Sequence, residues 1–181
     1  MTLDLHCQTL PDYLDFNLRV VMIGINPSIY SVERGHYYAN PRNRFWKAFN
    51  AAQLATKPLS PETDHEALRE GIGFTDLVKR PTHSMSDLRA PDYIEGSLLL
   101  KRKLIHYRPK TVCFSGLTAF AYYLRYTEGI KRKVLLGPQE QQIGDSLVFV
   151  APNPSPANAS FSLETITRSY NDLKRLIDVT S

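Results

Sequence analysis

Cysteine is almost missing from this chain of 181 residues, which contains only Cys7 and Cys113. Two thiols cannot build an iron–sulfur cluster, which needs four thiolates, or a cysteine-rich zinc site. Cys113 lies inside an apolar run and is predicted to be a buried thiol, which suits a reducing compartment. We therefore expect an intracellular protein, located in the cytoplasm or nucleoid if the source is bacterial.

Long hydrophobic runs are missing as well. No run comes near the roughly 20 apolar residues that cross a membrane, and residues 1–13 lack the apolar stretch of a secretory signal. The sequence contains no internal repeat, no low-complexity stretch and no linker that divides it. We expect a soluble monomer without membrane contact, with a single domain over residues 1–181 in which 1–17 form an N-terminal extension.

Charge of one sign is only slightly in excess, with 22 Lys and Arg against 18 Asp and Glu and a formal net charge of +4. Such an excess is compatible with a polyanionic partner but does not identify one. The runs 101–103 and 131–133 are basic, yet charge runs of this length usually lie in solvent. His65, His83 and His106 are far apart in unrelated contexts, so no metal site is predicted.

Three continuous apolar runs, 20–25, 111–114 and 147–150, predict buried strands. Continuous rather than alternating apolarity is typical of strands covered on both faces, as in a parallel sheet. Helical patterns lie between and after these runs, at 43–52, from the Ser60-Pro61 start to Gly71, from Asp92 through Ile105, and from Ser162 to Ile177. This alternation predicts an α/β fold, with the ligand site beyond the carboxyl ends of the strands.

The loop after the first strand carries an uncharged amide, Asn26, between Gly24-Ile25 and Pro27. Asparagine can orient a water molecule without ionising, and Gly24 allows close approach of backbone or ligand. An Asn-Pro turn without any chemical role is the simpler interpretation of this tetrapeptide taken alone.

Further motifs follow in a fixed order along the chain. Gly24-Ile25-Asn26-Pro27 is followed by Gly35-His36-x-Tyr38, Asn43-x-Phe45-Trp46, the segment 71–82, Tyr107-x-Pro109, Phe114-Ser115-Gly116 and Asn153-Pro154-Ser155. This ordered set resembles the mismatch-specific uracil/thymine-DNA glycosylase family, within the uracil-DNA glycosylase superfamily, over roughly residues 19–178.

The resemblance implies a three-layer α/β/α sandwich with a short parallel central sheet. It also implies base flipping and monofunctional hydrolysis, in which water replaces the base, without a metal or cofactor. The expected partner is double-stranded DNA that contains uracil or a mismatched or damaged pyrimidine, and single-stranded DNA is a further expected substrate.

Carried over residue by residue, the resemblance assigns Asn26 to the attacking water and Tyr38 to stacking on the flipped base. It places Ser31 at the pocket floor, the Thr75 hydroxyl near the water, and the backbone around Ile25 and Tyr38 at the pyrimidine edge. The expected catalytic residues are thus Asn26, Thr75 and Asp76, and the expected substrate-binding residues are Gly24, Ile25, Ser31 and Tyr38. DNA contacts are expected from Lys79, Arg80, Asn153, Pro154, Ser155, Pro156, Ala157 and Asn158.

Asp76 is assigned from chemistry rather than from the resemblance, because the family varies at this position. A carboxylate near the sugar could stabilise its positive charge or accept a proton, but Asp76 fits a turn or helix cap equally well. Lys79 and Arg80 follow it in a predicted site loop and could contact phosphates. His36 is expected to shape its loop rather than touch phosphate, and Phe45 and Trp46 are expected in the core.

Two departures from the family pattern bear on substrate choice. Ser28 stands where the best-known members have glycine, and the loop 154–159 lacks the bulky Leu or Arg that other members insert into the duplex. We therefore expect weaker dependence on a guanine partner and acceptance of single-stranded uracil.

The predicted function is excision of uracil from G·U pairs, extending to A·U pairs, single-stranded uracil, ethenocytosine and thymine in G·T. The alternative is a nucleic-acid-binding module that has kept the fold without the chemistry. A nucleoside hydrolase would need clustered carboxylates around the ribose, and the sequence has no such cluster.

Overall fold

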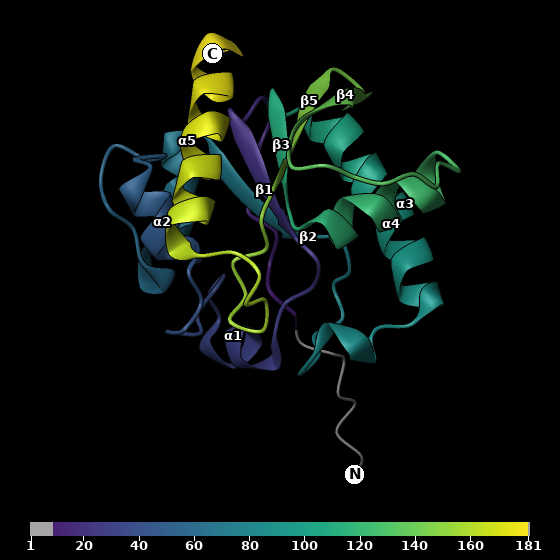
Figure 1. Cartoon of the computed structure of the whole chain (residues 1–181), viewed down its shortest axis with the longest axis horizontal. Helices are drawn as coiled ribbons and strands as arrows, with labels where there is room; N and C mark the ends of the chain where they lie inside the picture. The colour runs from purple at the N-terminus through teal and green to yellow at the C-terminus, as the bar shows by residue number, and fades with distance from the viewer. Residues whose placement is uncertain (1–8, 181) are drawn as a thin grey trace.

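The computed structural model describes residues 9–180, so Cys7 lies outside the described residues. A five-stranded sheet runs through the centre in the order β2-β1-β3-β5-β4 (Figure 1). The strands β1 (Val20–Gly24), β2 (Ile72–Asp76), β3 (Thr111–Ser115) and β5 (Ser146–Ala151) are parallel. The edge strand β4 (Gly137–Ile143) is antiparallel to β5. The predicted α/β class and central parallel sheet are confirmed.

Helices cover both faces of the sheet and make the three layers. One face carries α2 (Phe45–Ala51) and α5 (Leu163–Thr180), and the other carries α3 (Ala90–Tyr107) and α4 (Leu117–Thr127) (Figure 1). Along β1, Val20 and Met22 belong to the first core while Val21 and Ile23 belong to the second. Because alternate side chains are buried on opposite faces, the strand must be apolar throughout, which is why the continuous run predicted it.

Short elements complete the chain: α1 (Ile29–Arg34) and the 3₁₀ helices η1 (Pro61–Glu70) and η2 (Met85–Asp87). The predicted helix after Ser60 is therefore a 3₁₀ helix, which ends as predicted at Gly71, with φ of 71°. The α3 helix begins at Ala90, so Asp92 is its third residue and not its cap. The Asp92 carboxylate accepts a hydrogen bond of 2.7 Å from the Arg89 backbone N–H. None of the described helices is long and apolar enough to cross a membrane.

The strands β2 and β4 were not predicted. The β2 sequence, Ile-Gly-Phe-Thr-Asp, is short and ends in polar residues, a pattern that predicts a loop at Asp76. In the structure, Asp76 is the last residue of a buried strand. The β4 strand alternates between half-buried and exposed positions at the sheet edge and is rich in glutamine, so it has no apolar run to reveal it.

The segment before β1 packs against the sheet. Tyr13 exchanges two backbone hydrogen bonds of 2.9 Å with Phe74 of β2, and Leu10 is 2% exposed. Over its described part, the segment predicted as an N-terminal extension is thus integral to the fold. This position also brings Asp12 to the carboxyl end of β2.

Candidate active site at the carboxyl ends of the strands

Two loops are joined where β1 and β2 end. Backbone hydrogen bonds of 2.8–3.3 Å link residues 24–29, from the last residue of β1 to the first of α1, to residues 77–82, which follow β2. The strands themselves pair in register, with Gly24 opposite Asp76. The Gly-Ile-Asn-Pro motif and the segment 76–82 therefore form one side of the site, as expected for ligand-binding loops of a parallel sheet.

Asn26 is held by its amide nitrogen. Nδ2 donates to the Arg80 carbonyl oxygen at 3.0 Å and to Oγ1 of Thr82 at 2.8 Å. A carbonyl can only accept, so the amide orientation follows from this contact. Within residues 9–180 no group donates to the side-chain oxygen of Asn26, which leaves that oxygen available to hold a water molecule.

Asp76 is a buried carboxylate directly opposite Gly24. A Cβ atom on residue 24 would lie 2.5 Å from Oδ1 of Asp76, so glycine is required for this carboxylate to occupy its place. Oδ2 of Asp76 accepts no hydrogen bond within the described chain, and the ammonium of Lys79 lies 3.9 Å away. Burial raises the pKa of Asp76 to about 7, against a smaller lowering by Lys79.

Thr75 is also buried, but its hydroxyl donates to Oδ1 of Asp12 at 2.8 Å. The single hydroxyl proton is therefore used within the protein. The expected position of Thr75 near a water molecule stays a prediction.

Tyr38 lies on the loop between α1 and α2, in the left-handed backbone region with φ of 52°. Its ring stacks on Phe45 with centroids 3.8 Å apart and planes 7° apart. Its hydroxyl lies 3.3 Å from Oγ of Ser115, at the end of β3. Phe45 and Trp46 are buried as predicted; Phe45 supports the half-buried ring of Tyr38, and Trp46 packs edge-on against Phe45. One face of Tyr38 is thus occupied by Phe45, and stacking on a base would have to use the other.

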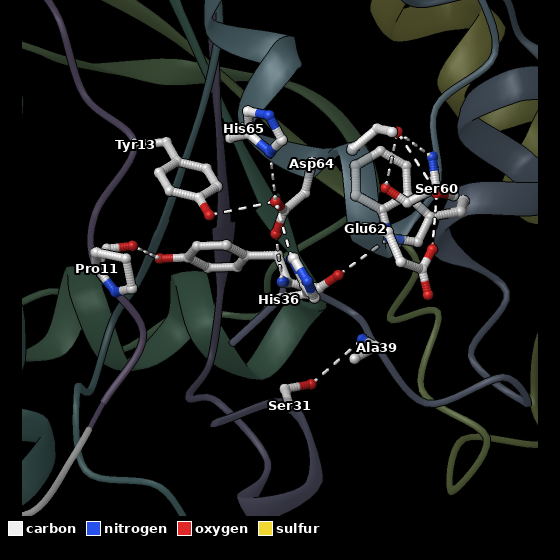
Figure 2. Close-up of polar contacts among 12 residues, drawn as sticks. Pro11, Tyr13, Ser31, His36, Ala39, Ser60, Glu62, Asp64 and His65 are labelled. Carbon is white, nitrogen blue, oxygen red and sulfur yellow. Dashed lines mark hydrogen bonds and ion pairs between the residues drawn. The ribbon is translucent and has the colours of Figure 1, made fainter. Parts of the chain in front are cut away.

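A buried carboxylate, Asp64 of η1, anchors the Tyr38 loop (Figure 2). It accepts from the Tyr37 backbone N–H at 2.8 Å and from the Tyr13 hydroxyl at 3.2 Å, and it pairs with Nδ1 of His36 at 3.3 Å. The loop-shaping position expected for His36 agrees with this contact. Nothing in the sequence around Asp64 singles it out, because its partners come from distant segments.

Ser31 supports the same loop from α1. Its buried hydroxyl accepts from the Ala39 backbone N–H at 3.3 Å and lies 3.1 Å from the hydroxyl of Ser28. Ser28 caps α1, since its Oγ accepts from the Ser31 N–H at 3.1 Å. The side chain that departs from the family pattern therefore has a local structural role, and the assignment of Ser31 to a pocket floor stays a prediction.

The loop after β5 is held by Arg44, which sequence reasoning did not single out. The Arg44 guanidinium donates to four backbone carbonyls of this loop: Pro154 at 3.3 Å, Ser155 at 2.7 Å, Asn158 at 2.6 Å, and Phe161. Within the loop, the Asn153 side chain accepts from the Ser155 N–H at 2.9 Å. This brings residues 153–158 to the Tyr38 loop, with Pro156 and Ala157 exposed at the tip.

Lys79 and Arg80, the expected phosphate contacts, both have partners within the protein. Lys79 donates to Asp12 at 2.8 Å, and Arg80 contacts both carboxylate oxygens of Asp92 at 2.9 and 2.7 Å. Binding of phosphate would require an exchange of partners. The DNA contacts of these two residues and of the 153–158 loop stay predictions.

These elements meet at one edge of the sheet and offer an amide oxygen, a buried carboxylate and an aromatic ring. An aromatic ring can stack on a planar ring, and an amide oxygen and a carboxylate can accept hydrogen bonds from a water molecule. Among residues 9–180, no three His, Cys, Asp or Glu side chains are grouped so as to hold a metal ion.

The chain is similar to known proteins over nearly its whole length. The sequence model of the Uracil DNA glycosylase superfamily matches residues 11–174. A curated G/U mismatch-specific uracil DNA glycosylase of Schizosaccharomyces pombe is 31% identical over 169 residues, covering 91% of this chain and 52% of that protein. The chain thus spans about half the length of this curated relative.

A solved structure shares the fold. The solution NMR structure of a candidate uracil DNA glycosylase from Methanosarcina acetivorans matches with a TM-score of 0.58. The match covers 95% of this chain and 98% of the other at 22% sequence identity, so it concerns the fold alone.

Proposed function

Since the chain belongs to the uracil DNA glycosylase superfamily over residues 11–174, we propose that it excises uracil from DNA by hydrolysing the N-glycosidic bond. The observation that carries this proposal is the pair formed by Asn26 and Asp76 at the joined ends of β1 and β2. Asn26 has an unengaged side-chain oxygen, and Asp76 has an unpartnered carboxylate oxygen. The G/U mismatch-specific name of the relative from Schizosaccharomyces pombe supports the choice of uracil.

In the proposed reaction, the bond between the sugar carbon C1′ and the base nitrogen breaks, and its electron pair leaves with the base. The oxygen of a water molecule held by Asn26 forms the new bond to C1′. Positive charge develops on the sugar in the transition state, so a neutral amide and an ionised Asp76 both suit this position. Asp76 then accepts the proton that the water loses.

Tyr38 stacks on the flipped base in this proposal, and backbone groups around Ile25 and Tyr38 contact its polar edge. A flipped uracil needs a flat apolar surface with hydrogen-bond partners at its rim. The rigid support of Tyr38 by Phe45 and by the Asp64 anchor favours this role, because an ordered ring loses little entropy on stacking.

The 153–158 loop is proposed to bind the phosphate backbone of the DNA and to enter the space in the duplex that the flipped base leaves. Its tip carries Pro156 and Ala157 and no large side chain. Discrimination of the opposite base should therefore be weak, so we propose that A·U pairs and single-stranded uracil are accepted alongside G·U pairs. Ethenocytosine and thymine in G·T pairs are proposed as further substrates.

Single-turnover cleavage of labelled oligonucleotides tests the proposal. Uracil is placed opposite guanine, opposite adenine and in a single strand, and alkali then converts abasic sites to strand breaks. Release by the wild type is expected to fall about 10²-fold in Asn26→Ala, because the attacking water loses the group that positions it. Asn171→Ala, an exposed amide on α5, is the matched control and should keep the wild-type rate.

Full activity of Asn26→Ala would contradict the assigned mechanism. Binding of uracil-containing duplex without release from any of these substrates, or from ethenocytosine and G·T duplexes, would favour a nucleic-acid-binding module with the same fold.

A further inference from the structure

Asp12, in the segment before β1, joins side chains from three separate parts of the chain. Its Oδ1 accepts from the Thr75 hydroxyl and from the Lys79 ammonium, both at 2.8 Å, and its Oδ2 pairs with Lys103 of α3. Burial opposes ionisation of Asp12, but the two ammonium groups and the hydroxyl outweigh it and lower the pKa of this carboxyl. Asp12 is therefore a fixed negative charge beside the site.

Lys79 lies between two carboxylates that differ in their contacts. Its Nζ is 2.8 Å from Oδ1 of Asp12, which is a hydrogen bond, and 3.9 Å from Oδ2 of Asp76, which is beyond hydrogen-bonding distance. Oδ2 of Asp76 accepts no hydrogen bond elsewhere in residues 9–180. The Lys79 ammonium thus donates a hydrogen bond to Asp12, outside the site, whereas it forms only a long ion pair with Asp76, inside the site.

We propose that Asp12 is a positioning residue for Asp76. By binding the Lys79 ammonium, Asp12 holds it out of hydrogen-bonding distance of Asp76 and so keeps the Asp76 carboxylate available in the site. The catalytic consequence rests on the proposed function, in which Asp76 accepts a proton from water. A carboxylate locked in a direct ion pair with lysine would be a weaker base. The arrangement therefore preserves the basicity that the reaction needs.

The charged groups that face Asp76 give the direction of each effect. Lys79 and Lys103 favour its ionised form, and Asp12 disfavours it. The phenols of Tyr37 and Tyr38 also lie within electrostatic reach and stay neutral, since burial raises the pKa of each. Removing Asp12 takes away a like charge and also leaves Asp76 as the remaining carboxylate partner for Lys79. Both changes should lower the pKa of Asp76, whereas removing Lys79 should raise it.

The test is a carboxyl ¹³C NMR titration of the full chain labelled at aspartate, with the Asp76 signal assigned by its loss in Asp76→Asn. We expect the Asp76 midpoint to fall by about one pH unit in Asp12→Asn and to rise by about one unit in Lys79→Met. Asp15→Asn is the matched control, because it removes the same charge from an exposed site in the same segment and should leave the midpoint unchanged.

An Asp76 midpoint that stays in place or rises in Asp12→Asn overturns the proposal. If Asp12→Asn does not fold, the Lys79→Met titration decides, and absence of an upward shift overturns the proposal equally.

The pH dependence of single-turnover cleavage separates this proposal from the proposed function. Rate midpoints that follow the NMR midpoints in both variants support the two together. Two outcomes contradict the catalytic role of Asp76. In the first, the NMR midpoints move as expected but the pH profiles of cleavage do not; in the second, the NMR midpoints move but the wild type cleaves no uracil substrate. Such a result would leave the contact between Asp12 and Lys79 as an electrostatic feature without catalytic effect.

Discussion

At the scale of single residues, the site combines a hydrogen-bonded amide nitrogen, that of Asn26, with a carboxylate oxygen of Asp76 that accepts no hydrogen bond within residues 9–180. The amide nitrogen of Asn26 has three acceptors within 3.2 Å, so its side chain is fixed and its oxygen is free. Asp76 is 5% exposed with one oxygen that accepts no hydrogen bond within residues 9–180. A buried carboxylate of this kind costs stability when it ionises, and such groups concentrate at functional sites.

The cost of ionising Asp76 should appear as pH-dependent stability. Its pKa is about 7 in the folded chain and near 3.8 in the unfolded chain, so the folded state binds the proton more tightly. The stabilising effect of this difference is present below about pH 4 and is lost as pH rises through about 7. In Asp76→Asn this loss should vanish, making the variant more stable than wild type at about pH 8 by as much as ~4 kcal/mol.

Urea denaturation of both proteins between about pH 4 and pH 8 measures this difference. The two stabilities should converge at the acid end, and a gap that stays constant with pH would contradict a buried ionisable Asp76.

Gly24 should be required because of Asp76 and not for backbone freedom. The Cβ of Gly24→Ala would lie 2.5 Å from Oδ1 of Asp76, so the carboxylate must move. We expect a loss of about 1–3 kcal/mol in unfolding free energy, as for other overpacked sites, together with lower cleavage activity. Thermal denaturation of Gly24→Ala, Asp76→Ala and the double variant measures the coupling.

The stability loss should be much smaller when alanine is introduced at 24 in the Asp76→Ala background. Additive losses in the double variant would show that alanine at 24 disturbs the backbone rather than the carboxylate.

At the scale of elements, the loops of the site are fixed by side chains that come from neighbouring helices and helix ends. Asp64 of η1 anchors the Tyr38 loop, and Arg44 anchors the loop after β5 through its carbonyl oxygens. Both anchors are charged donors or acceptors bonded to backbone groups, a stronger kind of contact than neutral hydrogen bonds. The Tyr38 loop and the loop after β5 are thus ordered without regular secondary structure.

Arg44→Lys should loosen the loop after β5 because one ammonium cannot reach the four carbonyls that the planar guanidinium spans. We expect faster amide hydrogen exchange in residues 153–161 and about tenfold weaker binding of uracil-containing duplex, consistent with the loss of one charged hydrogen bond. Arg42→Lys, an exposed neighbour, is the control and should resemble wild type in both measurements. Unchanged amide hydrogen exchange in Arg44→Lys would show that the loop stays ordered without the Arg44 guanidinium.

The small side chains at the tip of this loop should determine the preference for substrate strands. In Ala157→Leu, a bulky apolar group at the exposed tip should occupy the space left by the flipped base and favour duplex over single-stranded substrate. The measurement is the ratio of the single-turnover rate on G·U duplex to the rate on single-stranded uracil, which we expect to rise several-fold. Ala159→Leu, at the end of the same loop, is the control. An equal ratio in Ala157→Leu and wild type would exclude the tip from strand selection.

At the scale of the whole molecule, the N-terminal segment ties the sheet to the site. Leu10 belongs to the core on one face, Tyr13 pairs with β2, and Asp12 reaches Thr75 and Lys79. The family match begins at residue 11, in agreement with a segment that is part of the domain.

Deletion through Tyr13 should therefore destabilise the fold. A chain that begins at Leu14 loses the burial of Leu10 and the paired edge of β2, which together should cost about 3–5 kcal/mol. Thermal denaturation against a chain that begins at Thr9, which keeps every contact described for this segment, measures the loss. Equal melting temperatures would mean that the segment is dispensable.

The sequence by itself determined the α/β class, three of the five strands and the ordered motifs that indicate the family. These features are local: a strand buried on both faces must be apolar at each position, and a motif is a run of neighbouring residues. The sequence also predicted the core positions of Phe45, Trp46 and Cys113, because large apolar groups in such runs have no better place than the interior.

Only the tertiary structure decided which polar groups meet. Asp12, Asp64 and Arg44 carry no local signal, because each acts on residues 25 or more positions away along the chain. The strand position of Asp76 and the partners of Lys79 and Arg80 depend in the same way on how β1, β2 and the N-terminal segment are arranged. Hydrogen bonds and charge pairs between distant segments form only once packing has placed those segments side by side, so the chemistry of the site is a property of the fold.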